Sequence, residues 1–197
     1  MLKKAWKLYS KIFIFFFVLL LGVNCAKCEL TPVDAARNAK EHNNQGVIFM
    51  REGDYLAAIK EFKIAIGINP NTQSTSVYYN NLGQAYMKIY AFNKNRLLPV
   101  WAQSCFEQAL IGDCMNLVYY KNLVAAYEVR GNMNSKVSYH LAQKDKNPYS
   151  AIVVGLIYLK QNKIGAAITI LDNFCAQNPD LVITSDIKRL MADYEFI

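Results

Sequence analysis

Histidine is scarce in this sequence of 197 residues, which contains only His42 and His140. Neither belongs to a paired ligand spacing such as His-Glu-x-x-His, so the sequence predicts no zinc site. The chain also lacks a Ser/His/Asp set, a phosphate-binding glycine-rich loop and a carboxylate pair with a reason to be catalytic. We therefore expect no metal, no cofactor and no enzymatic activity.

Glycine and proline are sparse as well, with nine and five residues, which excludes collagen-like and low-complexity classes. Hydrophobic residues make up 53% of the chain and charged residues 19%, a globular rather than a disordered composition. The length suits one domain, or two small ones, with a real hydrophobic core.

The net charge of +7 is concentrated at the N-terminus. Four lysines precede the first apolar run: Lys3, Lys4, Lys7 and Lys11. Without them, 18 basic side chains face 15 acidic ones. This near balance gives no reason to expect a nucleic-acid partner.

No apolar run reaches the ~20 residues that a membrane-spanning helix needs. Residues 12–23 are uncharged and apolar, and they follow the four lysines. This order is typical of a secretory signal peptide, so we predict a signal peptide at residues 1–26 and an exported protein, periplasmic or extracellular. The alternative is an uncleaved membrane anchor, and the membrane would then be contacted only through this segment.

The chain has five cysteines, of which Cys25 and Cys28 form a Cys-x-x-Cys pair. Thiol oxidoreductases use this spacing, but here it follows a signal-like segment rather than a strand, so that function is a minor alternative. Cys25 also stands where a lipoprotein carries its lipid, without the small residue that normally precedes it. The other three are expected to pack as small hydrophobic side chains: Cys105, Cys114 and Cys175.

A spaced pattern of small, large and helix-ending residues occurs four times along the chain. Its clearest members in each copy are Gly46, Ala58, Phe62 and Pro70; Gly83, Ala102, Phe106 and Ala109; Tyr120, Leu123, Tyr127 and Pro148; and Gly155, Ala167, Leu171 and Pro179. The third copy departs from it at Val124, Lys136 and His140.

The pattern resembles the tetratricopeptide repeat (TPR), a helix-turn-helix unit of 34 residues. The resemblance covers repeats at about residues 39–72, 76–116, 117–148 and 149–181. It implies an all-α fold within residues 31–197, a right-handed superhelical solenoid of about four repeats that turn back at Gly53, Gly131 and Asn162. Small residues let the paired helices approach, large ones fill the spaces between them, and proline ends the second helix. Stacking is needed because one hairpin cannot bury its own apolar face.

Both ends of the array carry helix signals. Thr31 and Pro32 predict the start of a first helix that runs to about Arg51. A capping helix is predicted at residues 184–196, with Ser185 or Asp186 as its N-cap. Its apolar face is formed by Ile187, Leu190, Met191 and Tyr194. Three apolar side chains of the fourth repeat are expected to pack under it or, alternatively, to form an exposed partner site: Ile152, Leu156 and Leu159.

In this family the first helices line a concave groove that binds peptides or partner helices. The resemblance places these residues in the groove: Asn43, Asn44, Met50, Asn80, Asn81, Gln84, Met87, Lys121, Asn122 and Glu128. Asn44, Asn81 and Asn122 share the sixth motif position, which resembles the asparagine ladder of O-linked N-acetylglucosamine transferases. The alternative is that these amides bond only within the stack. The clamp that binds chaperone C-termini in cytosolic relatives is not matched.

An insertion at residues 91–98 interrupts the second repeat, and we expect it to be a loop. Lys94 and Arg96 beside Phe92 indicate contact with an acidic or membrane surface, and a silent insertion is the alternative.

The predicted function is a non-enzymatic scaffold outside the cytoplasmic membrane that binds a peptide or partner protein in its groove. Envelope assembly, secretion or complex assembly are the processes that this placement favours. The main alternative is a membrane-anchored complex subunit that keeps its signal segment.

Overall fold

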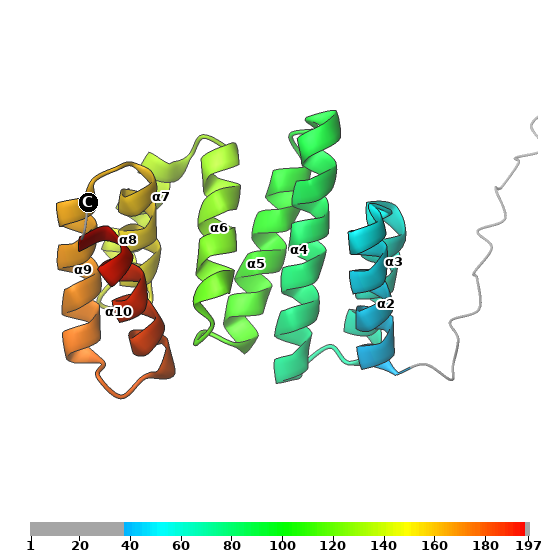
Figure 1. Cartoon of the computed structure of the whole chain (residues 1–197), viewed down its shortest axis with the longest axis horizontal. Coiled ribbons are helices and arrows are strands. Elements are labelled where there is room, and N and C mark those ends of the chain that lie inside the picture. Colours follow the sequence, from blue (N-terminus) through cyan, green and yellow to red (C-terminus); the bar gives the residue numbers. More distant parts are fainter. Residues whose placement is uncertain (1–37, 196–197) are drawn as a thin grey trace, which may run out of the picture. The chain divides into compact units, whose positions relative to one another are not determined.

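The computed structural model describes residues 38–195, and this part of the chain contains nine α-helices and no strand. The helices are α2 (Ala39–Glu52), α3 (Tyr55–Ile68), α4 (Gln73–Asn93), α5 (Leu98–Gly112), α6 (Leu117–Val129), α7 (Met133–Gln143), α8 (Ser150–Lys160), α9 (Ile164–Gln177) and α10 (Val182–Glu195) (Figure 1). The predicted all-α class is confirmed. None of these described helices combines the length and the hydropathy needed to cross a bilayer.

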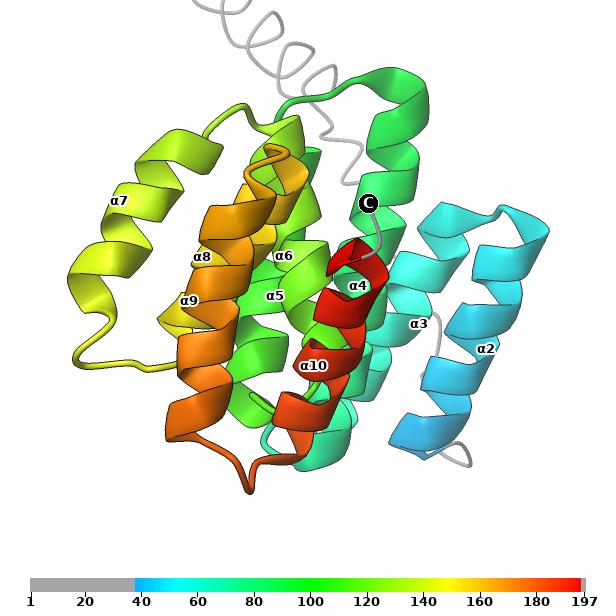
Figure 2. The same cartoon turned by 60° about the vertical axis from the view of Figure 1, so that its left-hand side comes forward.

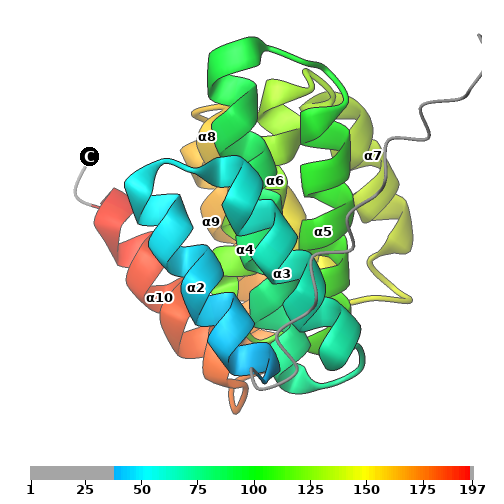
Figure 3. The ribbon, with the colours of Figure 1, turned by 90° about the vertical axis from the view of Figure 1, so that its right-hand side faces the viewer.

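The helices form four antiparallel pairs, α2/α3, α4/α5, α6/α7 and α8/α9, followed by α10. Three of the turns within pairs use left-handed backbone, as the sequence predicted: Gly53 has φ 83°, Gly131 has φ 67° and Asn162 has φ 58°. A view along the row of pairs shows α10 on the side of α2, opposite α5 and α7 (Figure 3). The last helix therefore lies against the face that the first helices form.

The first described helix begins later than the sequence predicted. Asn38 has an extended backbone and caps α2: its Oδ1 accepts the Glu41 N–H at 3.0 Å, and its own N–H donates to Glu41 Oε2 at 3.0 Å. A reciprocal capping box of this kind fixes a helix start, so the predicted continuous helix from Pro32 is wrong. Thr31 and Pro32 themselves lie outside the described residues, as do the signal segment and the Cys25/Cys28 pair.

The last helix begins at Val182, two residues before the predicted start. Ser185 is not its N-cap, because the Ser185 hydroxyl donates to the carbonyl of Val182 from inside the first turn, at 2.9 Å. Thr184 Oγ1 donates to the carbonyl of Asn178 at 2.6 Å and ties the helix start to the preceding turn. The predicted cap at Ser185 or Asp186 is therefore wrong.

The insertion at residues 91–98 is only partly a loop. Its first three residues extend α4 to 21 residues, and Leu98 already belongs to α5. Lys94 ends α4 in the left-handed region, with φ 55°. The end of α4 therefore projects beyond the ends of the neighbouring helices (Figure 1), and the ring of Phe92 stacks on that of Tyr55 at a centroid distance of 5.9 Å.

Close packing within a pair depends on a glycine under a large side chain. A Cβ on Gly46 would lie 2.5 Å from the ring of Phe62, and a Cβ on Gly155 would lie 2.5 Å from Leu171. The third pair has Val124 and His140 at the corresponding positions, and α7 contributes no buried residue. Figure 2 shows α7 standing away from the helices around it. The third hairpin is open because its sequence lacks the glycine and the aromatic residue.

Candidate binding face on the first helices

We call the surface of α2, α4, α6 and α8 on the α10 side the inner face. The predicted groove residues lie on or just below it, at different depths. The buried ones are Asn43 and Asn80; the half-buried ones are Met50, Asn81, Gln84, Met87 and Asn122; the exposed ones are Asn44, Lys121 and Glu128.

Two asparagine pairs connect neighbouring first helices. Asn81 Nδ2 donates to Asn43 Oδ1 at 2.9 Å, which joins α4 to α2. Asn122 Nδ2 donates to Asn80 Oδ1 at 2.7 Å, which joins α6 to α4 in the same way. Each bond runs from a sixth motif position to the fifth position of the preceding repeat. The asparagines thus bond within the stack, and Asn44 makes no hydrogen bond to another described residue.

These pairs fix the orientation of the half-buried amides. Asn81 and Asn122 each donate one amide N–H to an asparagine of the preceding first helix. Within residues 38–195 their side-chain carbonyl oxygens accept no hydrogen bond. An amide has two N–H donors and an oxygen with two acceptor sites. The inner face therefore presents oriented amides with unused donor and acceptor capacity.

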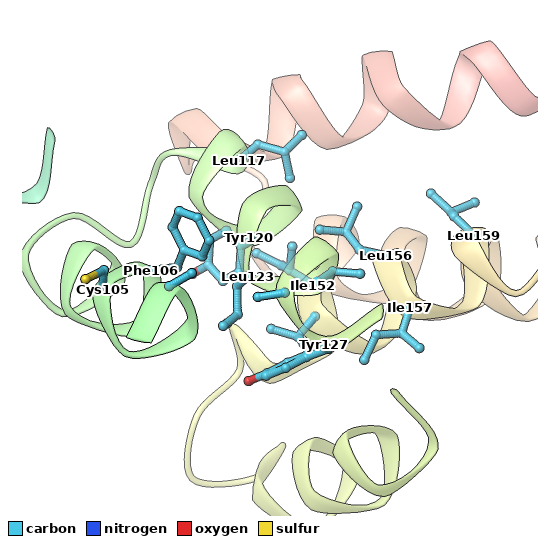
Figure 4. Close-up of a cluster of buried hydrophobic side chains, with 14 of the residues drawn as sticks. Cys105, Phe106, Leu117, Tyr120, Leu123, Tyr127, Ile152, Leu156, Ile157 and Leu159 are labelled. Atoms are coloured by element: carbon cyan, nitrogen blue, oxygen red, sulfur yellow. The ribbon is translucent and has the colours of Figure 1, made fainter. Parts of the chain in front are cut away.

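The last helix covers the inner face over α8 and part of α6. Ile183, Ile187 and Met191 of α10 are buried in one cluster with the inner-face side chains Val124, Ile152, Leu156 and Leu159. Figure 4 shows Leu156 and Leu159 directed towards the red ribbon of α10. The prediction that these side chains pack under the final helix is confirmed, and the exposed partner site at this position was wrong.

The open part of the inner face therefore lies on α2 and α4 and ends at the start of α6, where α10 lines a hollow together with Val118 and Lys121. Apolar side chains accompany the amides there: Val77 is 42% exposed and Val118 51% exposed. Met87 lies further along α4 and is half-buried. The surface offers hydrogen-bonding groups and apolar contacts together.

Glu128, the acidic residue among the predicted groove residues, already forms an ion pair within the protein. Glu128 Oε2 lies 3.1 Å from Lys160 Nζ, which joins α6 to α8, and both side chains are about half exposed. The Glu128 carboxylate is therefore partly neutralised by the protein itself.

The open third hairpin contains a cavity of about 520 Å³ between α5, α6, α7 and α8. Its polar groups form a chain: Tyr127 O–H approaches Glu107 Oε1 at 3.5 Å and His140 Nε2 at 3.4 Å, and His140 Nδ1 approaches Ser150 Oγ at 3.4 Å. Burial, and secondarily the positive charge of Lys136, lower the pKa of His140 to about 4. Its imidazole is therefore neutral at pH 7.

The three cysteines and His42 of the described residues have structural surroundings rather than those of a reactive site. Burial raises the pKa of the Cys105 thiol to about 12 and raises that of Cys175 as well, so both are unreactive thiols. Cys114 is half-buried rather than buried. His42 is buried with its Nδ1 2.7 Å from Glu61 Oε2. Across the described residues, no cluster of His, Cys, Asp and Glu is arranged to hold a metal ion.

Sequence reasoning missed two features. Ile183 is fully buried at the start of α10, and it was overlooked because the helix was expected to begin after it. Leu97 and Trp101 are 56% and 47% exposed, although their helical spacing is typical of a buried stripe. The exposure of Leu97 and Trp101 could not be inferred from the sequence, because it depends on whether another helix covers that side of α5.

Comparisons with known proteins identify the first hairpin. Residues 42–72 match the family model of the tetratricopeptide repeat. A tetratricopeptide-repeat protein from Parabacteroides merdae is 18% identical over 78% of this chain, with a TM-score of 0.47, and the chain spans 58% of that protein. MamA protein is 18% identical over 79% of this chain and 85% of its own, with a TM-score of 0.46. A TPR protein from Thermus thermophilus is 15% identical over 81% of this chain and 100% of its own, with a TM-score of 0.40. No curated protein sequence matches the chain.

Proposed function

We propose that this chain, whose residues 42–72 match the family model of the tetratricopeptide repeat, is a non-enzymatic scaffold whose open inner face binds an extended peptide of a partner protein. The observation that carries the proposal is the pair of amide bonds Asn81–Asn43 and Asn122–Asn80. They hold a row of amides at a fixed orientation across three first helices. Preorganised polar groups bind a ligand without a further loss of side-chain entropy.

The peptide backbone is the part of a ligand that such amides recognise. Each free carbonyl oxygen accepts a peptide N–H, and each free amide N–H donates to a peptide carbonyl. Selectivity for side chains comes from Val77, Val118 and Met87, which offer apolar contacts between the amides. The face binds a backbone with little regard to sequence and favours apolar residues at intervals.

We place this activity outside the cytoplasmic membrane, in envelope assembly, secretion or the assembly of a complex. The support is the order of lysines and apolar residues in residues 1–26. Mass spectrometry of the N-terminus tests it. A chain that starts after Cys25 or Ala26 supports a cleaved signal, an intact N-terminus in the membrane fraction supports an anchored subunit, and an intact soluble chain contradicts both.

Peptide display on the full chain tests the binding activity. We expect display of random peptides to select a common extended motif. The double variant Asn44→Ala, Gln84→Ala should weaken the selected peptides at least about tenfold, the loss of one or two hydrogen bonds. Neither side chain makes a hydrogen bond within the described residues, so the fold is spared.

Gln108→Ala is the matched control, because Gln108 is exposed on α5 rather than on the inner face. It should leave the affinity unchanged. Selected peptides that bind the double variant as well as the original chain would place the binding site elsewhere.

A further inference from the structure

The end of α4 and the start of α5 form a projecting feature that peptide binding does not use. We call residues 91–101 the tip. Its apolar side chains are open to solvent: Phe92 is 75% exposed, Leu97 56% and Trp101 47%. Leu97, Val100 and Trp101 lie at helical spacing on one side of α5. Exposed large apolar side chains that cluster in this way mark an interaction site.

The charged side chains in the segment of chain that contains the tip have one sign. From Phe62 to Phe106 the chain contains no aspartate and no glutamate, whereas Lys63, Lys88, Lys94 and Arg96 are all cationic. The apolar tip therefore stands in an electropositive segment. A partner that covers it should carry negative charge beside an apolar region.

A cavity of about 540 Å³ opens beside the tip. Its walls include Arg96 from the tip and Arg130 from the end of α6, together with Tyr90 and Val100. The carboxylate in its lining, Glu128, is already paired with Lys160. Arg130 also donates from Nη1 to Gln103 Oε1. Its remaining donors and the guanidinium of Arg96 line the same cavity and suit a phosphate, since planar donors bind its oxygens in pairs.

We propose that the tip docks on an anionic phospholipid bilayer. Phe92, Leu97 and Trp101 enter the interfacial region, and Arg96 and Arg130 hold a lipid phosphate at the adjoining cavity. Trp and Phe next to Lys and Arg are the side chains that settle at a membrane surface. This contact is separate from the N-terminal segment, and it develops the contact with an acidic or membrane surface that the sequence indicated for residues 91–98.

The shape of the tip favours a bilayer over a peptide or a nucleic acid. A peptide ligand is held in a depression, whereas Phe92 belongs to the end of α4, which projects beyond its neighbours (Figure 1). Leu97 and Trp101 are exposed at the start of α5, which follows it. A nucleic acid would use the cationic groups and could stack a base on Phe92, but it would leave Leu97 and Val100 without apolar contacts. A lipid surface satisfies both kinds of group at once.

Quenching of Trp101 by brominated lipids tests the proposal on the full chain. The sequence has two tryptophans, so Trp6→Phe leaves Trp101 as the sole reporter. We expect brominated vesicles of phosphatidylcholine with phosphatidylglycerol to quench Trp101, and vesicles of phosphatidylcholine alone to do so far less. Brominated chains quench only a tryptophan that they contact, so quenching reports that Trp101 itself reaches the bilayer, which binding through residues 1–26 alone does not require.

The double variant Lys94→Gln, Arg96→Gln should raise the anionic lipid concentration for half-quenching about 30-fold, since each basic residue near the surface contributes roughly fivefold. Phe92→Ser, Leu97→Ser should lower the extent of quenching. The control Lys144→Gln, Lys146→Gln removes two exposed lysines from the loop between α7 and α8 and should change neither value.

The proposal would be overturned if anionic vesicles did not quench Trp101, or if the Lys94/Arg96 variant and the Lys144/Lys146 control had equal effects. Binding of an oligonucleotide or an acidic peptide at the tip without binding to vesicles would overturn it as well. Loss of vesicle contact in the tip variants should leave the affinity for selected peptides unchanged, so the two proposals fail separately. Binding of inorganic phosphate at Arg96 and Arg130 without quenching of Trp101 by vesicles would indicate an anion site only and would also reject the bilayer.

Discussion

The ring of Phe106 occupies the space that a side chain on Gly83 would need. A Cβ placed on Gly83 would lie 2.5 Å from Cε1 of Phe106 and 2.9 Å from two further ring atoms. Phe106 is 1% exposed, so its ring has no room into which to retreat. The close approach of α4 and α5 at this point of the second hairpin therefore depends on the absence of a side chain on Gly83.

Gly83→Ala should therefore destabilise the protein by about 1–3 kcal/mol, the usual penalty of overpacking a buried site. Urea unfolding followed by circular dichroism measures the change. Gly67→Ala is the control: Gly67 lies in the helix α3 with nothing within 4 Å of the added Cβ. That substitution should stabilise by roughly 0.5–1 kcal/mol through helix propensity and the unfolded state. A similar loss in both variants would show that the Phe106 contact is not responsible.

The open third hairpin should close when its missing pair is restored. Val124→Gly alone should cost about 3 kcal/mol, because it removes a buried side chain and introduces a flexible residue into α6. Combined with His140→Phe, the loss should be at least ~1 kcal/mol smaller than the sum of the two single variants. Urea unfolding of the four proteins gives this coupling energy. Strict additivity would mean that the two positions do not meet even when α7 is free to approach α6.

Stability should fall in acid because the half-buried His140 is held in its neutral form. Its pKa is lowered from 6.5 to about 4, so the folded state disfavours the protonated imidazole that the unfolded chain adopts readily. The contribution is therefore constant above pH 6.5 and is lost as the pH falls towards 4. Compared with His140→Gln, the original chain should lose roughly 2 kcal/mol over this window, a value reduced for partial exposure.

The comparison with His140→Gln cancels the titration of His42 and of the carboxylates, which both proteins share. Unfolding free energies at several values between pH 7 and pH 4 provide the measurement. Parallel pH profiles for the two proteins would contradict a neutral buried His140.

The Asn122–Asn80 hydrogen bond should couple the second and third repeats. Asn80→Ala leaves the Asn122 N–H without its acceptor in a partly buried place, and a loss of about 1–3 kcal/mol is expected. Asn80→Ala with Asn122→Ala should cost less than the two single losses together. Asn44→Ala, at an exposed amide with no partner among the described residues, should leave stability within about 0.5 kcal/mol. Equal losses at Asn44 and Asn80 would show that the pairing contributes nothing.

Removing the apolar anchor of α10 should uncover the inner face without unfolding the rest. Ile187 is fully buried, and Ile187→Ala should cost about 2–5 kcal/mol. Hydrogen exchange should then quicken in α10 and on α8, while α2 and α4 keep their protection. Uniform quickening through all helices would instead indicate that the array unfolds as one cooperative unit.

The sequence was sufficient to predict the helical hairpins but not the residues at which the first and last helices begin. Gly46 and Phe62 recur as Gly83 and Phe106, and this spacing predicted helices that pack closely and turn back at Gly53. The starts at Ala39 and Val182 were missed because several nearby residues can cap a helix, and the choice depends on tertiary contacts. Thr184, for example, bonds a carbonyl of the preceding turn.

The sequence predicted which asparagines lie at the candidate site, but it did not predict which of them pair with one another. Asparagines stand side by side at Asn43–Asn44 and Asn80–Asn81, so the sequence allows a row at one motif position as well as the staggered pairs that form. Small rotations between repeats decide between these arrangements. Exposure at Leu97 and Trp101 was hidden for a related reason: an apolar helical stripe is the same letter pattern whether or not a neighbour covers it.

The position of α10 also sets a length limit on whatever lies along the amides. First helices follow one another at roughly 10 Å, so α2, α4 and the start of α6 offer a track of about 20 Å. An extended chain advances ~3.3 Å per residue, and about six residues fill that track before the next one meets Leu190 and Tyr194 at the α10 end of the α6/α8 hollow. If the proposed peptide lies along the amides, the last helix limits its bound segment to about six residues.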